Sequence, residues 1–361
     1  MTVTFSALSS PDSTTGSDAR AAPRAVALWL LGVAASIFAM AVIGAITRLT
    51  ESGLSIMEWA PVSGFLPPLT TAEWERLLDL YRRTAEYQQI NRGMSLAEFR
   101  EIFWWEWIHR QWGRFIGLAY ALPLAWFWLR GGLPGWIKPH LLFALGLGAL
   151  QGFMGWFMVA SGFFGERTDV SQYRLVLHLS LALVIYAYLL WLSLSLLRAS
   201  AVAETDRSLS VQAKLFAGLL AVTVVSGGFV AGTDAGMTYN TFPLMDGRLL
   251  PTGYAALQPW WLNWFETIEA IQFNHRLLAV TTAVAAVLLW LQSLRRPLTR
   301  DIRQGFAAVA GVALAQTALG IATLLMAVPI WLGALHQAGA LCLIAATVFL
   351  LHGLRGGRTA A

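Results

Sequence analysis

Eight apolar runs, each about as long as a bilayer is thick, constrain this chain more than any other feature. A helix needs roughly 20 apolar residues to cross the hydrocarbon core. The chain is 57% hydrophobic and only 12% charged over 361 residues, a balance typical of a polytopic membrane protein. We therefore predict an all-α integral membrane protein with eight transmembrane helices in the lipid bilayer. The runs lie near residues 25–48, 108–129, 141–162, 175–197, 214–233, 271–292, 305–328 and 332–352.

The charges between these runs predict the orientation of the helices. The two ends of the chain and the loops after the second, fourth and sixth runs share one side, which carries thirteen basic and five acidic residues. The other side carries twelve basic and fifteen acidic residues. Because Lys and Arg are enriched on the cytoplasmic side, we expect both termini in the cytoplasm. Only two of the 25 basic residues are Lys, which suggests a GC-rich bacterial genome and hence a bacterial inner membrane. The net charge of +5 is thus a topology signal and gives no reason to expect nucleic-acid binding.

The second half of the chain repeats motifs of the first. The segment ITRLTESGLSIMEWAPVSGFLPP after the first run resembles VAGTDAGMTYNTFPLMDGRLLPT after the fifth, with WIHR matching FNHR, QGFMG matching QTALG and VLHLS matching ALHQA. Each half begins and ends on the same side, so the repeats are parallel and related by an axis along the membrane normal. We expect two pseudosymmetric four-helix bundles.

This repeat sets the expected domain boundaries. An N-terminal bundle is expected over residues 23–200 and a C-terminal bundle over 215–353, joined by a cytoplasmic linker over 201–214. The Ser/Thr-rich segment 1–22 and residues 354–361 are expected to be cytoplasmic tails, the first of them disordered. The outer loop 50–105 is the long one, and its segment 71–101 is predicted to form one or two amphipathic surface helices.

Four of the six histidines are expected at a similar depth near the outer surface. His109, His178, His275 and His336 lie in the first turns of runs that all start on the outer side, two in each repeat at equivalent positions. Neutral imidazoles from facing helices commonly hold haem iron in a bundle core, so His109/His178 and His275/His336 are candidate iron-binding pairs. Interfacial histidines bonded to neighbouring helices are the alternative. Zinc is less favoured, since no thiolate or carboxylate completes a four-ligand set in the second half.

His140 and His352 fall at the cytoplasmic ends of helices and are expected to be interfacial polar residues. Cys342 lies in the last run and is expected to be a small packing residue. Because it is the only cysteine, it cannot form a disulfide within the chain.

An acid is present in one repeat only. Glu106 precedes His109 by three residues and shares its helix face, whereas the matching position in the other repeat is Gln272. A carboxylate can exchange protons or stabilise a positive charge, but an amide cannot. The asymmetry indicates chemistry in the N-terminal half and electron storage or transfer in the C-terminal half. Simple pairing with an arginine, or capping of the helix, is the alternative for Glu106.

Arg110 and Arg276 directly follow the first histidine of each pair. Their guanidinium groups could bind haem propionates by bidentate hydrogen bonds. The alternative is that they snorkel to the lipid headgroups.

The segments ITRLTESGLSIMEWAPVSGFLPP, EWIHRQWGR, NTFPLMDGRLLP and FNHRLLA resemble haem A synthase, in particular its mitochondrial and alphaproteobacterial branch without loop cysteine pairs. The resemblance covers about residues 25–352 and implies eight helices in two four-helix bundles. It also implies oxidation of the C8 methyl group of the substrate haem O to a formyl group, through two successive hydroxylations and loss of water, for cytochrome oxidase biogenesis.

The resemblance further implies roles for single residues. The positions of His275 and His336 match those that ligate the cofactor haem b, whereas His109 and His178 match positions at the substrate haem, and Glu106 matches the functional glutamate. Haem O synthase is expected as a partner by family analogy. The electron donor and the oligomeric state, including a homo-oligomer, are left open.

Two other functions remain consistent with the residues alone. A dihaem cytochrome b that passes on electrons from quinol would have two equivalent haem pairs, which Glu106 against Gln272 disfavours. A haem-free repeat transporter would typically have inverted repeats and broken helices, which the parallel repeat disfavours.

Overall fold

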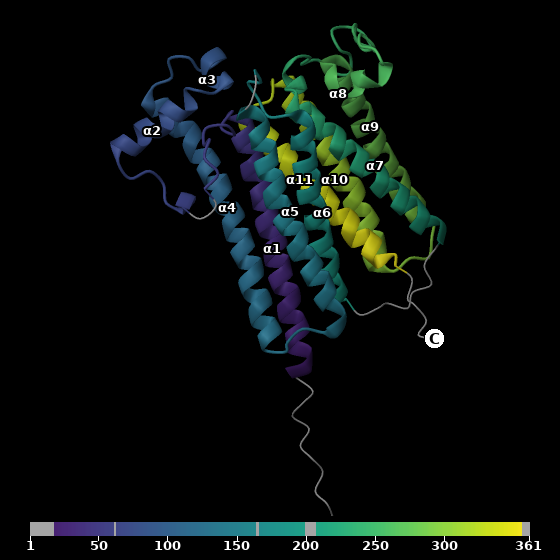
Figure 1. Cartoon of the computed structure of the whole chain (residues 1–361). Helices are drawn as coiled ribbons and strands as arrows, with labels where there is room; N and C mark the ends of the chain where they lie inside the picture. Colours follow the sequence, from purple (N-terminus) through teal and green to yellow (C-terminus); the bar gives the residue numbers. More distant parts are fainter. Residues whose placement is uncertain (1–17, 61–62, 164–165, 199–206, 356–361) are drawn as a thin grey trace, which may run out of the picture.

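The structure, a computed structural model, describes residues 18–60, 63–163, 166–198 and 207–355. Helices account for nearly all of its regular structure, and within these ranges the only β-pairing is an isolated bridge between Met245 and Arg248. Figure 1 shows long helices running side by side, with α2, α3 and α8 gathered at the end opposite the start of α1. The elements in chain order are α1 (Asp18–Leu49), η1 (Ser63–Phe65), α2 (Thr71–Tyr81), α3 (Ala85–Gln89), α4 (Leu96–Leu129), η2 (Gly135–Ile137), α5 (Lys138–Phe163), α6 (Gln172–Leu197), α7 (Arg207–Gly232), η3 (Ala235–Met237), η4 (Trp260–Leu262), α8 (Asn263–Glu266), α9 (Ile268–Ser293), α10 (Arg300–Leu325) and α11 (Ile330–Gly353).

Length and composition make this a multi-pass membrane protein. In the described part of the chain, seven helices are long and apolar enough to cross a bilayer, namely α1, α5, α6, α7, α9, α10 and α11. The 34-residue α4 is not among them, although the second apolar run of the sequence lies within it. The all-α membrane class expected from the sequence is therefore confirmed.

The long helices pack as two groups. Helix α1 contacts α4 and α6, and α5 also contacts α4 and α6, so α4 and α6 occupy opposite corners of the first group. In the same way, α9 and α11 both contact α7 and α10 in the second group. The groups meet where α1 contacts α11 and where α6 contacts α7 and α11. Each group buries its own apolar core, one around Leu30, Ile137 and Leu189 and the other around Phe216, Phe306 and Leu350.

The outer segment forms a small domain over the start of α4. Helix α2 begins with a capping box between Thr70 and Glu73, and α4 begins with one between Ser95 and Glu98. The buried face of α2 packs on the first two turns of α4 in an aromatic cluster of Trp74, Leu77, Leu78, Tyr81, Phe99 and Phe103. One or two amphipathic surface helices were expected within residues 71–101, and the structure has two short helices there, α2 and α3. The helix predicted from residue 108 instead begins at Leu96, because this cluster extends it beyond the apolar run.

Several other expected boundaries fall elsewhere. Helix α1 begins at Asp18, inside the segment 1–22 expected to be a disordered tail, and residues 1–17 lie outside the described part. Helix α7 begins at Arg207, inside the segment expected to be a linker. The rest of that linker, 201–206, and most of the C-terminal tail, 356–361, are also outside the described residues.

Arg48, at the end of α1, forms ion pairs with residues of both helix groups. The Nη2 atom of Arg48, at the end of α1, lies 2.9 Å from Asp169 Oδ2 and 2.6 Å from Asp234 Oδ2. Asp169 lies between α5 and α6, whereas Asp234 follows α7. One guanidinium group therefore links loops of the two helix groups at the outer end.

A buried carboxyl group on α3 lies near these ion pairs. Glu86 is only 4% exposed, and among the described residues its Oε2 atom has no hydrogen-bond partner. Burial, followed by the nearby carboxylate of Asp169, raises the pKa of the Glu86 carboxyl to about 8. Glu51 and Glu106 act in the same direction, while a hydrogen bond with Tyr81 opposes them.

Glu86 should make the outer segment less stable as the pH rises. Below its ordinary pKa of 4.5 the carboxyl is protonated in both states and burial costs no ionisation energy. Between pH 4.5 and about pH 8 the carboxyl is ionised in the unfolded state but still protonated in the folded state. The free energy of unfolding therefore falls as the pH rises through this range. We expect the melting temperature of Glu86→Gln to exceed that of the wild type at about pH 8 and to match it at about pH 5. Glu75→Gln, at an exposed position on α2, is the control, and a constant difference between Glu86→Gln and wild type across this range would contradict the assignment.

Candidate functional site

Four histidines are placed on α4, α6, α9 and α11, the corner helices of the two groups. All four helices run in the same direction in Figure 1, and each histidine lies in the N-terminal half of its helix. His109 and His178 lie within electrostatic range of each other, and so do His275 and His336. The structure therefore brings together the two pairs expected from the sequence. All four side chains are half-buried.

Each of these imidazoles lies against a glycine of a neighbouring helix. A Cβ atom added to Gly44 of α1 would lie 3.3 Å from His109 Nε2, and one added to Gly155 of α5 would lie 3.0 Å from His178 Cε1. In the second group, a Cβ on Gly227 of α7 would be 3.0 Å from His275 Cε1. A Cβ on Gly320 of α10 would be 2.7 Å from His336 Cε1. The missing side chains let the rings lie directly on helix backbone.

The ring and backbone atoms of the histidines have different partners in the two groups. The Gln151 Nε2 atom lies 3.1 Å from His178 Nδ1 and 3.1 Å from the His178 carbonyl oxygen. The Ser226 hydroxyl lies 2.9 Å from His275 Nδ1. Gln316 donates to the His336 carbonyl oxygen at 2.8 Å, and no described residue forms a hydrogen bond with His336 Nδ1. The sequence motifs do not predict these contacts of Gln151, Gln316 and Ser226, although QGFMG and QTALG match as repeats.

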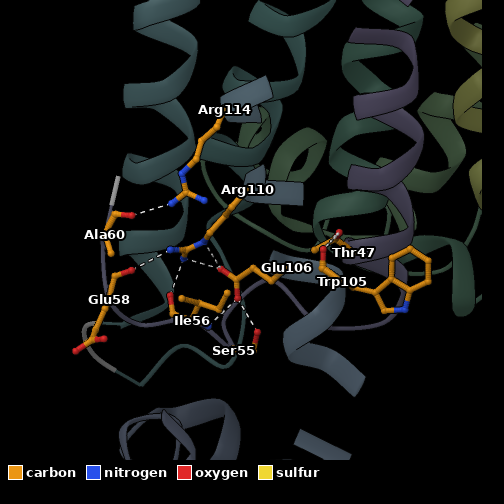
Figure 2. A network of polar contacts seen from close by, with 9 residues as sticks. All are labelled: Thr47, Ser55, Ile56, Glu58, Ala60, Trp105, Glu106, Arg110 and Arg114. Carbon is orange, nitrogen blue, oxygen red and sulfur yellow. Dashed lines mark hydrogen bonds and ion pairs between the residues drawn. The ribbon is translucent and has the colours of Figure 1, made fainter. Parts of the chain in front are cut away.

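Glu106 is buried in a complete hydrogen-bond network (Figure 2). Its Oε1 atom accepts from Arg110 Nη2 at 2.6 Å and from Arg110 Nε at 3.1 Å. Its Oε2 atom accepts from the Ser55 hydroxyl and from the Ile56 backbone N–H, both at 2.7 Å. The carboxylate thus holds the loop after α1 against α4, three residues before His109.

Gln272 occupies the corresponding place in the second group, where it donates a hydrogen bond to the facing loop. Its Oε1 accepts from Arg276 Nη2 at 2.9 Å, but its Nε2 donates to the carbonyl oxygen of Ala235 at 2.6 Å. The loop after α1 therefore offers hydrogen-bond donors to residue 106, whereas the loop after α7 offers an acceptor to residue 272. Glutamate and glutamine each match the loop that they face.

Arg110 and Arg276 hold these loops in the same way. Arg110 donates to the carbonyl oxygens of Ile56 at 2.6 Å and Glu58 at 2.9 Å. Arg276 donates to the carbonyl oxygens of Tyr239 at 2.6 Å and Thr241 at 2.7 Å. These contacts give both arginines an anchoring role within the protein. Binding of haem propionates by either one stays a prediction.

The remaining histidines and the cysteine differ from expectation in part. His140 is exposed and its Nδ1 lies 2.8 Å from the Tyr188 hydroxyl. His352, expected at the interface, is instead buried at 2% exposure, packed on Trp191. Cys342, expected to pack inside, is exposed on α11, because neighbouring Leu341 and Leu343 fill the core.

The histidine pairs fit haem iron better than a bare metal ion. No group of three or more His, Cys, Asp or Glu in the described ranges could hold a metal ion by itself. Haem needs only two ligands from the protein, because the macrocycle supplies the other four. Two imidazoles per pair, set against glycine backbone among apolar helices, provide this donor set.

Adding a methyl group at Gly320 should weaken the site at His336. In Gly320→Ala, the new Cβ would lie 2.7 Å from the ring, so the imidazole or the helix must shift at a cost of about 1–3 kcal/mol. We expect less b-type haem per polypeptide, measured by absorbance. Gly311→Ala on the same helix is the matched control, because nothing lies within 4 Å of its new Cβ. Equal haem content in both variants would argue against the close packing of His336 on α10.

Fold and site together define a helical multi-pass membrane protein with two pairs of histidines, one accompanied by an acid and one by an amide. The chain belongs to the COX15-CtaA family of cytochrome oxidase assembly proteins, whose model matches residues 27–348. It is 52% identical to the haem A synthase of Rhodospirillum centenum over 340 residues, covering 94% of this chain and 91% of that protein. It is 44% identical to the haem A synthase of Nitrosospira multiformis (93% and 95% covered) and 46% identical to that of Granulibacter bethesdensis (93% and 89%).

Proposed function

We propose that this chain is a haem A synthase, an oxidoreductase that converts the C8 methyl group of haem O to the formyl group of haem A for cytochrome oxidase biogenesis. Family membership and the haem A synthases with which it shares 44–52% identity support this function. The observation in the structure that carries it is the pairing of His109 with His178 and of His275 with His336. Two such pairs suit one substrate haem and one cofactor haem.

We further propose eight transmembrane helices in two pseudosymmetric four-helix bundles, over residues 23–200 and 215–353, with α4 as the eighth span. The matched contacts of Arg110 and Arg276 support this symmetry, since each binds loop carbonyls two residues apart. The matched glycines Gly44 and Gly227, and Gly155 and Gly320, support it as well. In a bacterial inner membrane, the charge bias would place both termini in the cytoplasm.

The histidine pairs are proposed to have different occupants. His275 and His336 would hold haem b, which supplies one-electron transfer when bound. His109 and His178 would hold the substrate haem. The assignment rests on Glu106 lying beside the first pair and Gln272 beside the second, because only the acid can carry charge or exchange a proton near the reacting methyl group.

Glu106 would act from a fixed position. Four hydrogen bonds orient its carboxylate, and Arg110 keeps it bound to the loop after α1. Its proposed role is to stabilise positive charge, or to take up a proton, as the methyl group is oxidised. Arg110 would keep the carboxylate in place and keep the loop closed over this end of the pair.

Delivery of haem O by haem O synthase, and reduction by a separate electron donor, are proposed from the same family relation. Co-purification of haem O synthase with the tagged chain from its own host membrane tests the first. A tagged membrane protein of similar size serves as the control for non-specific capture.

A further inference from the structure

The matched glutamines Gln151 and Gln316 form different hydrogen bonds with their histidines. Gln151 Nε2 lies 3.1 Å from the His178 carbonyl oxygen, but also 3.1 Å from Nδ1 and 3.3 Å from Nε2 of the ring. Gln316 donates to the His336 carbonyl oxygen at 2.8 Å, and in the described part of the chain the ring Nδ1 of His336 has no hydrogen-bond partner. Of these two glutamines, Gln151 alone is bonded to an imidazole ring.

The amide of Gln151 competes with iron for His178. A neutral imidazole has one nitrogen with a free lone pair, and an amide nitrogen can only donate. If the lone pair is on Nε2, the Gln151 N–H occupies it directly. If it is on Nδ1, the Gln151 N–H holds that form and Nε2 carries the proton, so Nε2 cannot bind iron. In either case, ligation through Nε2 requires loss of the hydrogen bond from Gln151.

His275 in the second bundle is held in the opposite way. The Ser226 hydroxyl lies 2.7 Å from the Thr223 carbonyl oxygen and 2.9 Å from His275 Nδ1. When its one proton is donated to the carbonyl, its oxygen accepts from a proton on His275 Nδ1. In this tautomer the lone pair of Nε2 is free for a metal, which is the form that iron needs.

We propose that Gln151 makes His178 a replaceable iron ligand, so that the first pair releases its haem while the second pair retains its haem. The inference rests on the proposed function, because a synthase must take up haem O and give up haem A at one site in every turnover. A haem that only transfers electrons has no need to leave. The hydrogen bond from Gln151 stabilises the empty form of the first pair and so lowers its net affinity for haem.

Haem release from the purified protein tests this role. The protein is isolated from cells that make haem O and mixed with excess apomyoglobin as a haem acceptor, and the loss of O- and A-type haem is followed over time. In Gln151→Leu and Gln151→Met, which lack the amide donor, release should be about three- to tenfold slower than in wild type, the effect of one neutral hydrogen bond. The fraction of low-spin, six-coordinate haem should rise with it. Gln316→Leu, which removes only a bond to a backbone carbonyl, should not slow this release.

The outcomes separate this inference from the proposed function. If His178→Ala retains O- and A-type haem, the assignment of the first pair to the substrate is wrong. The proposed role of Gln151 is then wrong as well. If His178→Ala loses this haem but both Gln151 variants release it at the wild-type rate or faster, only the role of Gln151 is wrong. Slower release in both variants, with unchanged release in Gln316→Leu, supports the proposal.

Discussion

Replacing Glu106 by glutamine should lower haem A formation by about 100-fold or more, the usual range for loss of a group that transfers protons, while the haem b spectrum stays intact. The substitution gives position 106 the same side chain as its counterpart Gln272 in the other repeat. It also replaces an acceptor by a donor where the loop offers donors, because an amide N–H would face the Ser55 hydroxyl or the Ile56 N–H. Haem A and haem O are measured by extraction of pigment from purified protein.

The same variant separates the two roles available to Glu106. If the carboxylate takes part in the chemistry, Glu106→Gln should still bind haem O and accumulate it. If Glu106 only anchors the loop after α1, bound haem O should be lost together with the product. Glu101→Gln, at an exposed position on the same helix, controls for loss of a carboxylate on α4. A normal yield of haem A from Glu106→Gln would refute both roles.

His336→Ala should remove the b-type absorbance of the purified protein. The second pair has no other imidazole to replace it, and loss of one of two axial ligands leaves a five-coordinate iron that is held less tightly. Haem A formation should fail as well, because the electron relay would be gone. The measurement is a reduced-minus-oxidised spectrum with haem quantified per polypeptide.

Replacing His178, the matched histidine of the first pair, should affect the other kind of haem. His178→Ala should lose O- and A-type pigment but keep haem b, whereas His140→Ala, at an exposed position outside both pairs, should keep both. An unchanged b-type spectrum in His336→Ala would contradict the assignment of the second pair to the cofactor.

The features that could be predicted from the sequence depend on local periodicity or on the fixed offset between the two repeats. Long apolar runs gave the long helices, and the register of the repeat identified His109, His178, His275 and His336 as two pairs. The contrast of Glu106 with Gln272 was also visible, since it needs only an alignment of one half on the other. In each case the informative residues lie close together in the chain or at a fixed offset.

The remaining features depend on contacts between distant segments. The start of α4 at Leu96 follows from aromatic packing on α2, which hydropathy does not encode. The burial of His352 follows from its contact with Trp191 on another helix. Gln151 shares a motif with Gln316, yet only the packing of α5 on α6 shows that one amide reaches a ring and the other does not. Residue identity alone does not specify such geometry.

The content of haem in the purified wild-type protein tests the central claim most directly. A pyridine haemochrome spectrum, combined with extraction and separation of the pigments, gives the kind and number of haems per polypeptide. Two inequivalent haem sites predict haem b together with haem O or haem A, with the O- and A-type pigment lost in His178→Ala and haem b lost in His336→Ala. Haem b alone in cells that make haem O would instead describe an electron-transfer cytochrome, and a protein without haem would contradict the account altogether.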